Sequence, residues 1–232
     1  MNNTILSADT SGKTATVALL NDEKIIANYT INIGLTHSQK FLPLIEQMLE
    51  NAGVDIAEID YFAIANGPGS FTGLRIGAST MKALAHTLNK PVIEVSTLDG
   101  LAANVSDFTG YVCPVLDARR QEVYTAVYKN GKKVLADCNI SLADLLDYFN
   151  NKKGKILFLG DGVTVYKQII ESILPKRAVF APKHLLLQNA GSVGLVAQRE
   201  IEKGNIQTYK TIKVSYLKKA QPEQEKERKK PE

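Results

Sequence analysis

The sequence is poor in cysteine and histidine, and it has no apolar run long enough to cross a lipid bilayer. There are 2 Cys residues in 232. Cys113 and Cys138 lack the spacing of a metal site or a redox pair, so we interpret them as buried thiols. The first residues show no charged segment followed by an apolar one, as a secretory signal would. We therefore expect a cytoplasmic protein with no membrane partner.

The histidine content argues against metal-dependent hydrolysis. The chain has 3 His residues, His37, His86 and His184, and they are far apart in the sequence. None belongs to an HxxxH or HExxH pair, which would present two imidazoles on one helix face. Cys113 has no sequence signature of a catalytic nucleophile, and no serine–histidine–acid set can be assigned. The sequence thus predicts neither a metal site nor catalytic residues.

The composition is that of a folded protein with one large core or two modest ones, since 44% of the residues are hydrophobic and 22% are charged. The formal net charge is +4. Acidic and basic residues balance in the last residues, so the surplus lies in the folded body, where it is weak evidence for an anionic partner. The charged tail, residues 218–232, is expected to be disordered.

The first third of the chain alternates in a regular order. Three strands are predicted at residues 5–8, 14–20 and 24–33, followed by a helix at 37–52 and a strand at 61–65. A glycine-rich loop, a helix ending near residue 88 and the strand "PVIEVS" complete the order βββαβαβ.

The middle of the chain repeats this order. A strand runs to Asp117, an asparagine-glycine turn follows at "KNGK", and a helix starts near residue 141 before the strand "KILFLG" and a "GDG" loop. We therefore predict a duplicated α/β fold with domains 1–104 and 105–217 and a cleft between them. A helix at 164–174 closes the second copy, a helix at 187–203 packs back on the first domain, and residues 209–217 are extended.

The loop "NGPGSFTGLRIG", residues 66–77, allows two interpretations. Ser70 or Thr72 can cap the helix that follows, and a helix N-terminus attracts anions, which would explain Arg75 in its first turn. The loop lacks the lysine of a Walker motif, however, and its glycines do not fit the dinucleotide fingerprint. A tight scaffold turn and a phosphate contact both stay open. With the "DTSGKT" turn, the candidate phosphate residues are Asp9, Thr10, Ser11, Gly67, Gly69, Ser70, Thr72, Gly73 and Arg75.

The two helices of the first copy are apolar over more than one face. In the helix at 37–52 the apolar arc is wider than a sheet alone requires, and the helix after the glycine loop carries a stripe of small residues. Either both helices are wholly core, or part of their surface is covered by a partner.

Five stretches resemble a known family in order and spacing: "ILSADTSGKTATVAL", "THSQKFLPLIEQML", "NGPGSFTGLRIG", "VSTLDGLA" and "DARRQEVY". They are similar to the TsaB (YeaZ) family of bacterial tRNA threonylcarbamoyladenosine biosynthesis proteins, over about the first 130 residues. The repeated βββαβα unit is similar to the actin, hexokinase and heat-shock ATPase superfamily, which has a ribonuclease H-like fold.

This resemblance implies a noncatalytic partner of TsaD, the enzyme that transfers a threonylcarbamoyl group to the adenosine beside the anticodon of tRNAs reading A-starting codons. It implies a heterodimer through the two helices, contact with TsaE, tRNA binding through the complex, and ATP and Mg only in the complex. A homodimer and a monomer both stay open for the chain without TsaD. The implied interface residues are Phe41, Leu42, Ile45, Leu49, Gly77, Ala78, Met81, Ala85 and Leu88. The alternative is an independent ATP-dependent phosphotransferase that uses Asp9 and the two glycine loops.

Overall fold

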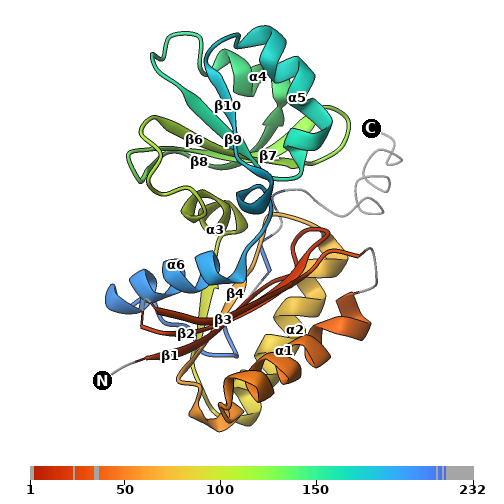
Figure 1. The fold of residues 1–232 in the computed structure, drawn as a ribbon, viewed down its shortest axis with the longest axis vertical. Coiled ribbons are helices and arrows are strands. Elements are labelled where there is room, and N and C mark those ends of the chain that lie inside the picture. The colour runs from red at the N-terminus through yellow and green to blue at the C-terminus, as the bar shows by residue number, and fades with distance from the viewer. Residues whose placement is uncertain (1–2, 23, 34–36, 213, 216, 218–232) are drawn as a thin grey trace, which may run out of the picture.

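The computed structural model describes residues 3–22, 24–33, 37–212, 214–215 and 217, and its strands form two five-stranded sheets (Figure 1). The first sheet and its helices are β1 (Thr4–Asp9), β2 (Ala15–Asn21), β3 (Lys24–Ile31), α1 (His37–Ala52), the 3-10 turn η1 (Ile56–Glu58), β4 (Tyr61–Ala65), α2 (Phe71–Thr87) and β5 (Val92–Val95). Helix α3 (Thr97–Ala103) leads to the second sheet.

The second sheet repeats the first element by element. It comprises β6 (Tyr111–Asp117), β7 (Glu122–Lys129), β8 (Lys132–Ser141), α4 (Leu142–Asp147), β9 (Ile156–Leu159), α5 (Gly162–Ile173) and β10 (Ala178–Phe180), before η2 (Lys183–Leu185) and α6 (Ala190–Glu202). The strand orders are β3-β2-β1-β4-β5 and β8-β7-β6-β9-β10. In each sheet the first three strands are antiparallel and the last two are parallel to the first. The duplication predicted from the sequence is confirmed.

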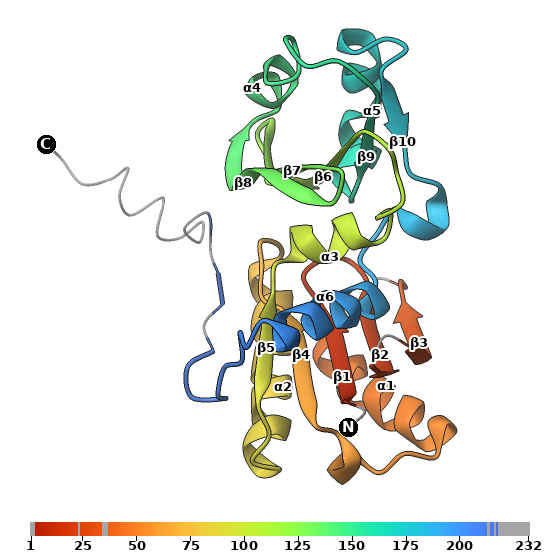
Figure 2. The same ribbon diagram turned by 90° about the vertical axis from the view of Figure 1, so that its left-hand side faces the viewer.

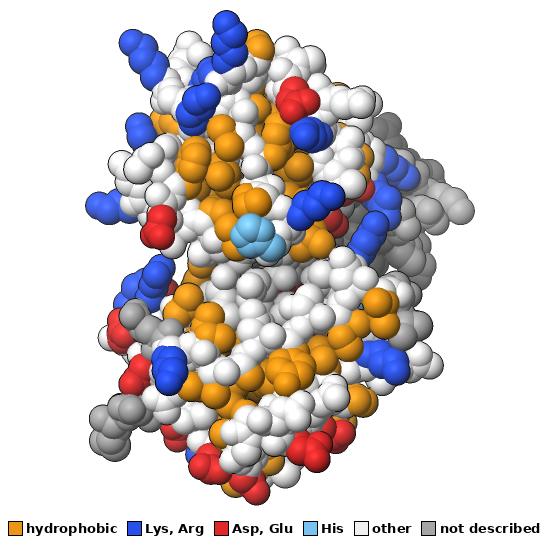
Figure 3. All heavy atoms as spheres, in the orientation of Figure 1, with side chains coloured by type: hydrophobic (Ala, Val, Ile, Leu, Met, Phe, Trp, Pro, Cys, Tyr) orange, Lys and Arg blue, Asp and Glu red, His pale blue; other side chains and the backbone are white. Residues whose placement is uncertain are grey.

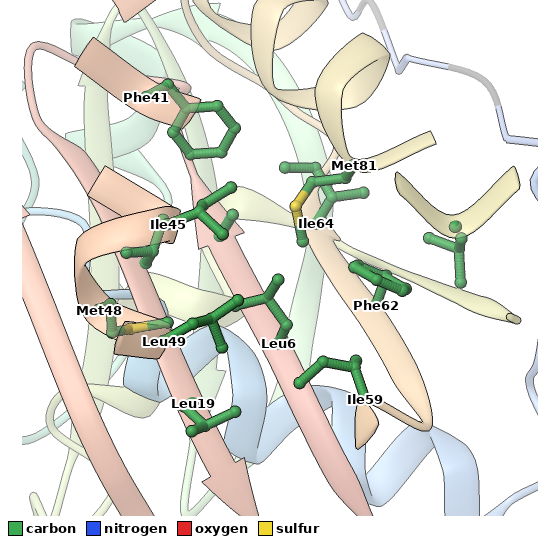
Figure 4. Close-up of a cluster of buried hydrophobic side chains, with 14 of the residues drawn as sticks. Leu6, Leu19, Phe41, Ile45, Met48, Leu49, Ile59, Phe62, Ile64 and Met81 are labelled. Atoms are coloured by element: carbon green, nitrogen blue, oxygen red, sulfur yellow. The ribbon is translucent and has the colours of Figure 1, made fainter. Parts of the chain in front are cut away.

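Both faces of the first sheet are buried, which explains why its central strands are continuously apolar. Side chains alternate along β1, so Leu6 and Ala8 pack toward α1 and α2, whereas Ile5 packs toward α6. Figure 4 shows this core, where Phe41 and Met48 from α1 lie on the side of β1 and β2, and Met81 from α2 lies beside Ile64 of β4. The first sheet therefore forms the middle layer of a helix–sheet–helix sandwich.

Helices α3 and α6 contact each other and fill the space between the two sheets (Figure 2). Leu98 and Leu101 of α3 pack on the second sheet, whose other face is covered by α4 and α5. Helix α6 packs directly on the first sheet, and Ser7 Oγ on β1 donates a hydrogen bond to the Ala190 carbonyl of α6 at 2.7 Å. The second half of the chain thus returns to cover the first sheet.

A group of polar contacts joins the second sheet to the segment around α3. The Tyr128 hydroxyl donates to Asp99 at 2.6 Å, and Lys133 Nζ lies 2.9 Å from Asp99 and 2.6 Å from Asp137. Ser96 Oγ donates to Asp137 at 2.5 Å. Ser96 and Asp99 belong to the cap and first turn of α3, whereas Tyr128 lies on β7 and Lys133 and Asp137 lie on β8. This group therefore fixes the second sheet relative to the connection between the halves.

After α6 the chain runs along the free edge of β5. Gln207 exchanges backbone hydrogen bonds with Val92, the Tyr209 ring stacks on His86 with centroids 4.5 Å apart, and Ser215 N donates to the Asn66 carbonyl. The expected extended segment at 209–217 is wrong at residues 209–211, which form a turn, and the described residues after it are in no regular strand. The predicted disorder of residues 218–232 concerns residues outside the described part.

Candidate functional site

The turn between β1 and β2 contains the first group of candidate residues. Asp9, at the end of β1, is 1% exposed, and its Oδ1 accepts a hydrogen bond from Ser11 N at 2.7 Å. Burial raises the pKa of the Asp9 carboxyl to about 6, although the hydrogen bond from Ser11 and the nearby His37 oppose the rise. His37 Nε2 lies 2.9 Å from the Gly12 carbonyl oxygen. The Asp9 carboxylate therefore holds its own turn.

The glycine loop rests directly on this turn. Ser70 N donates to the Ser11 carbonyl at 2.6 Å, and Thr10 Oγ1 donates to the Gly73 carbonyl at 2.8 Å. A Cβ at Gly69 or Gly73 would come within 3.0 Å of the Ser11 or Thr10 carbonyl oxygen. Glycine is required here because two backbones are in contact, which is the scaffold role of the two interpretations.

The N-terminus of α2 is capped by the chain itself. Ser70 is the N-cap, and its hydroxyl accepts from Gly73 N at 3.3 Å, as the sequence predicted for either Ser70 or Thr72. The Arg75 guanidinium lies over the Phe71 ring with 3.9 Å between Cζ and the ring centroid. Arg75 thus has an aromatic contact in the first turn, and Thr72 is exposed. Whether an anion binds here stays a prediction.

Gln188 forms the opposite wall of the turn. A Cβ at Gly12 would come within 3.0 Å of the Gln188 carboxamide, which also accepts a 3.4 Å hydrogen bond from Thr14 Oγ1. Gln188 is 4% exposed. Sequence reasoning missed this residue, because a contact between positions 174 residues apart leaves no local pattern.

The corresponding turn of the second copy lies near the turn between β1 and β2, because the charge of Lys13 acts on Asp161, and we call the region between these two turns the cleft. Asp117 accepts from Tyr166 Oη and from Arg119 N, each at 2.9 Å, and its own N–H donates to Asp161 Oδ1 at 3.1 Å. Burial raises the pKa of Asp161, and the charge of Lys13 from the first copy opposes this rise. The sequence pointed to Asp117 and the "GDG" loop, but not to Tyr166.

The predicted interface residues need a correction. Of the nine, Leu42 is 42% exposed and Leu88 is partly buried, but the other seven lie inside the core of this chain. The buried seven are Phe41, Ile45, Leu49, Gly77, Ala78, Met81 and Ala85. Met81 has 0% exposure, so its side chain packs within the core rather than on the outer surface of α2. The two-helix interface stays a prediction, and it would have to use the outer faces of α1 and α2.

Two further findings concern the described residues only. Among them, no three His, Cys, Asp or Glu side chains are close enough together to hold a metal ion. None of the helices in this part of the chain is long and apolar enough to cross a membrane.

Comparison with known proteins gives consistent matches. The model of the family "TsaD: tRNA N6-adenosine threonylcarbamoyltransferase" matches residues 24–224. The tRNA threonylcarbamoyladenosine biosynthesis protein TsaB of Bacillus subtilis strain 168 is 40% identical over 175 residues, which cover 74% of this chain and 76% of the relative. TsaB of Escherichia coli K12 is 37% identical over 130 residues, 55% of this chain and 56% of the relative.

Solved structures agree with this result. A crystal structure described as similar to the peptidase YEAZ from Pseudomonas aeruginosa has a TM-score of 0.79 at 27% identity, covering 93% of this chain and 100% of that chain. YeaZ from Pseudomonas aeruginosa has a TM-score of 0.73 at 28% identity, covering 90% and 97%. The two sheets repeat one βββαβα order, as the sequence predicted. The chain belongs to the TsaB (YeaZ) family, within the wider family that the TsaD model describes.

Proposed function

We propose that this chain is a noncatalytic partner of TsaD in the biosynthesis of threonylcarbamoyladenosine in tRNA. In this role it holds TsaD in a productive arrangement while TsaD modifies the adenosine beside the anticodon of tRNAs that read A-starting codons. The 40% identity to TsaB of Bacillus subtilis supports the pathway. The contact between the glycine loop and the β1–β2 turn supports the proposal that this chain is itself noncatalytic.

That contact supports the scaffold role, because the two loops are hydrogen-bonded directly to each other. Ser70 N and the Ser11 carbonyl oxygen are 2.6 Å apart, so they satisfy each other. Ser70 Oγ takes the helix N–H of Gly73, and Gln188 lies over Gly12 on the other side of the turn. These residues are therefore better suited to supporting helix α2 than to binding a nucleotide as an ATPase does. We propose that ATP and Mg are bound only in the complex with TsaD and TsaE.

The alternative is an independent ATP-dependent phosphotransferase. Two carboxylates lie at the cleft, the buried Asp9 at the end of β1 and the half-buried Asp161 at the N-cap of α5, and burial raises the pKa of both. Such carboxylates could hold a hydrated metal and its nucleotide. Isothermal titration of the isolated chain with ATP and magnesium separates the two functions, since a phosphotransferase must bind nucleotide by itself. We expect no binding heat.

The TsaD contact, in this proposal, uses the outer faces of α1 and α2. These helices contact each other along the first sheet, and Leu42 and Leu88 reach their surface. Without TsaD the same faces are available to a second copy of the chain. A charge at Leu42 would bury an unpaired ion at the interface, a penalty of several kcal/mol. A micromolar association, worth about 8 kcal/mol, would lose most of its affinity.

The decisive experiment is threonylcarbamoylation of unmodified tRNA with TsaD, TsaE and this chain, each omitted in turn. Activity should require this chain and TsaD together. Leu42→Glu should abolish co-purification with TsaD and activity. Ile169→Glu, on α5, is the matched control, because Ile169 is 43% exposed and Leu42 is 42% exposed. Full activity of the mixture without this chain would refute the partner role, and an unaffected Leu42→Glu would refute the two-helix contact.

A further inference from the structure

The second domain carries a basic hollow far from the cleft. It has a volume of about 480 Å³, and each lining residue is basic except for one glycine. The lining residues are Lys152, Lys153, Gly154, Lys155, Lys176 and Arg177. They come from two loops, one before β9 and one before β10.

The strand directions place this hollow at the edge of the second sheet opposite the cleft. Strands β6, β9 and β10 are parallel, and their carboxyl ends lead to the cleft residues Asp117 and Asp161. The loops before β9 and β10 therefore lie at the other edge. The β7–β8 hairpin turns at the same edge, because Tyr111 pairs with both Lys129 and Ile156. Lys129 and Lys132 thus extend the row of basic side chains, which we call the basic edge.

Hydrogen bonds fix the two loops to each other. The Arg177 guanidinium donates to the carbonyls of Phe149, Lys152 and Gly154, and Lys155 Nζ donates to the Lys176 carbonyl at 2.9 Å. The guanidinium of Arg177 therefore uses its hydrogen-bond donors within the protein, on the loop before β9. The exposed lysines of the hollow are carried on a rigid base, so they lose less conformational freedom on binding an anion than lysines on a loose loop would.

The charge distribution singles out this domain. Residues 1–104 contain 6 basic and 10 acidic side chains, whereas residues 105–189 contain 12 basic and 8 acidic ones. Seven of those 12 basic residues form the basic edge. On the face shown in Figure 3, Lys and Arg gather at the top of the second domain and Asp and Glu at the far end of the first. An anionic partner would thus be attracted to the second domain and repelled from the first.

We propose that the basic edge binds the phosphate backbone of the tRNA that the complex modifies. The inference rests on the proposed function, which brings a tRNA to this chain and TsaD together. Lysine contacts to phosphates position a nucleic acid without reading its sequence, which suits a subunit that must serve several tRNAs. The basic edge lies at the opposite end of the molecule from α1 and α2, so TsaD and the tRNA backbone can contact this chain at once.

The test is the affinity of the reconstituted complex for an unmodified tRNA transcript at several salt concentrations, measured by fluorescence anisotropy. The triple variant Lys153→Gln, Lys155→Gln, Lys176→Gln removes three charges from the hollow and leaves Arg177 in place. The matched control removes three charges elsewhere, with Lys24→Gln, Lys203→Gln and Lys210→Gln, at residues that are also exposed. A Lys→Arg triple at the three hollow positions keeps the charge.

Each phosphate contact contributes about 0.7 to 0.9 to the slope of log affinity against log salt. The Gln triple should therefore lower the slope by about 2 to 3 and weaken tRNA binding about tenfold or more near 0.1 M salt. The control and Lys→Arg triples should match the unaltered complex. Melting temperatures of all variants check that they are folded. If the Gln triple melts at a lower temperature than the unaltered chain, the double variant Lys153→Gln, Lys176→Gln replaces it, because it keeps the Lys155 hydrogen bond. The double variant should show half to two-thirds of the triple variant's change in slope.

The two proposals fail in different ways. If the unaltered chain supports tRNA modification and the Gln variant binds tRNA with unchanged affinity and slope, the basic edge is not an RNA site, although the partner role stands. If the chain does not support modification at all, the proposed function fails first. Binding of the free chain to phosphatidylserine vesicles, lost in the Gln triple while tRNA affinity is unchanged, would assign the edge to a membrane surface and overturn the RNA proposal.

Discussion

Substitution of Gly73 by alanine tests whether the glycine loop is a scaffold. Gly73 lies in the first turn of α2, and a Cβ there would come within 3.0 Å of the Thr10 carbonyl oxygen. A backbone oxygen at the end of a central strand cannot rotate away as a side chain can. The helix must therefore move, and it would strain the hydrogen bond from Thr10 Oγ1 to the Gly73 carbonyl.

The size of the effect follows from three contributions. Overpacking a tight contact costs about 1–3 kcal/mol. Loss of the Thr10 hydrogen bond costs about 1 kcal/mol, and the better helix propensity of alanine returns up to about 1 kcal/mol. The net loss is about 2 kcal/mol, which lowers the melting temperature of a chain of this size by about 4–8 °C.

The assay is thermal unfolding followed by circular dichroism, with Gly191→Ala as the control. Gly191 is also in the first turn of a helix, but a Cβ there would meet the end of the flexible Ile25 side chain. The control should stay within about 0.5 kcal/mol of the unaltered protein. Equal melting temperatures for Gly73→Ala and Gly191→Ala would refute the scaffold interpretation, because the close backbone approach at Gly73 would then make no difference to the stability of the fold.

Three further predictions concern stability. Met81→Glu should unfold the chain or lower its unfolding free energy by at least about 3 kcal/mol, because it buries an unpaired carboxylate; a folded variant by circular dichroism would show that Met81 is not core. The raised pKa of Asp9, from 3.8 to about 6, means that its protonated form stabilises the fold below pH 4 and that this contribution disappears as the pH rises through 6. Urea titrations should show a stability difference between the unaltered chain and Asp9→Asn that changes by about 3 kcal/mol over this interval, and a constant difference contradicts it. Lys133→Met leaves Asp99 and Asp137 without their shared cation, so protease cleavage between the two sheets should become faster, and an unchanged rate contradicts the prediction.

Regular elements with local signals were predictable from the sequence. The helix at 37–52 coincides with α1, and the serine cap of α2 and the strand at 61–65 are where the patterns indicated. The duplication was also visible, because the aspartate after the first strand and the asparagine turn recur at similar spacing. In all of these, the signal comes from residues within a few positions of each other, where backbone propensity and periodicity act.

The faces of the helices were not predictable in the same way. The apolar residues of α1 are so numerous that periodicity could not decide which of them face the sheet, and Leu42 alone among the predicted α1 residues is exposed. On α2, the small residues suggested a docking stripe, yet Gly77 is small because Thr10 and Ile64 of the first sheet lie against it, and Ala78 is buried. A sequence shows that a helix must come close to something, but the fold decides whether that neighbour is its own strand or another chain.

The two copies show that glycine in these loops reflects packing before it reflects any ligand. In the second copy, a Cβ at Gly160 or Gly162 would come within 3.0 Å of the Val115 carbonyl oxygen, just as Gly73 meets Thr10 in the first. Ser70 caps α2 with its hydroxyl, whereas Asp161, the N-cap of α5, makes no side-chain cap hydrogen bond but places its carboxylate at that helix N-terminus. A bound phosphate would have to displace the Ser70 cap in one copy and approach a carboxylate in the other. The glycines that suggested a nucleotide site in the sequence therefore follow from the way each helix is seated on its sheet.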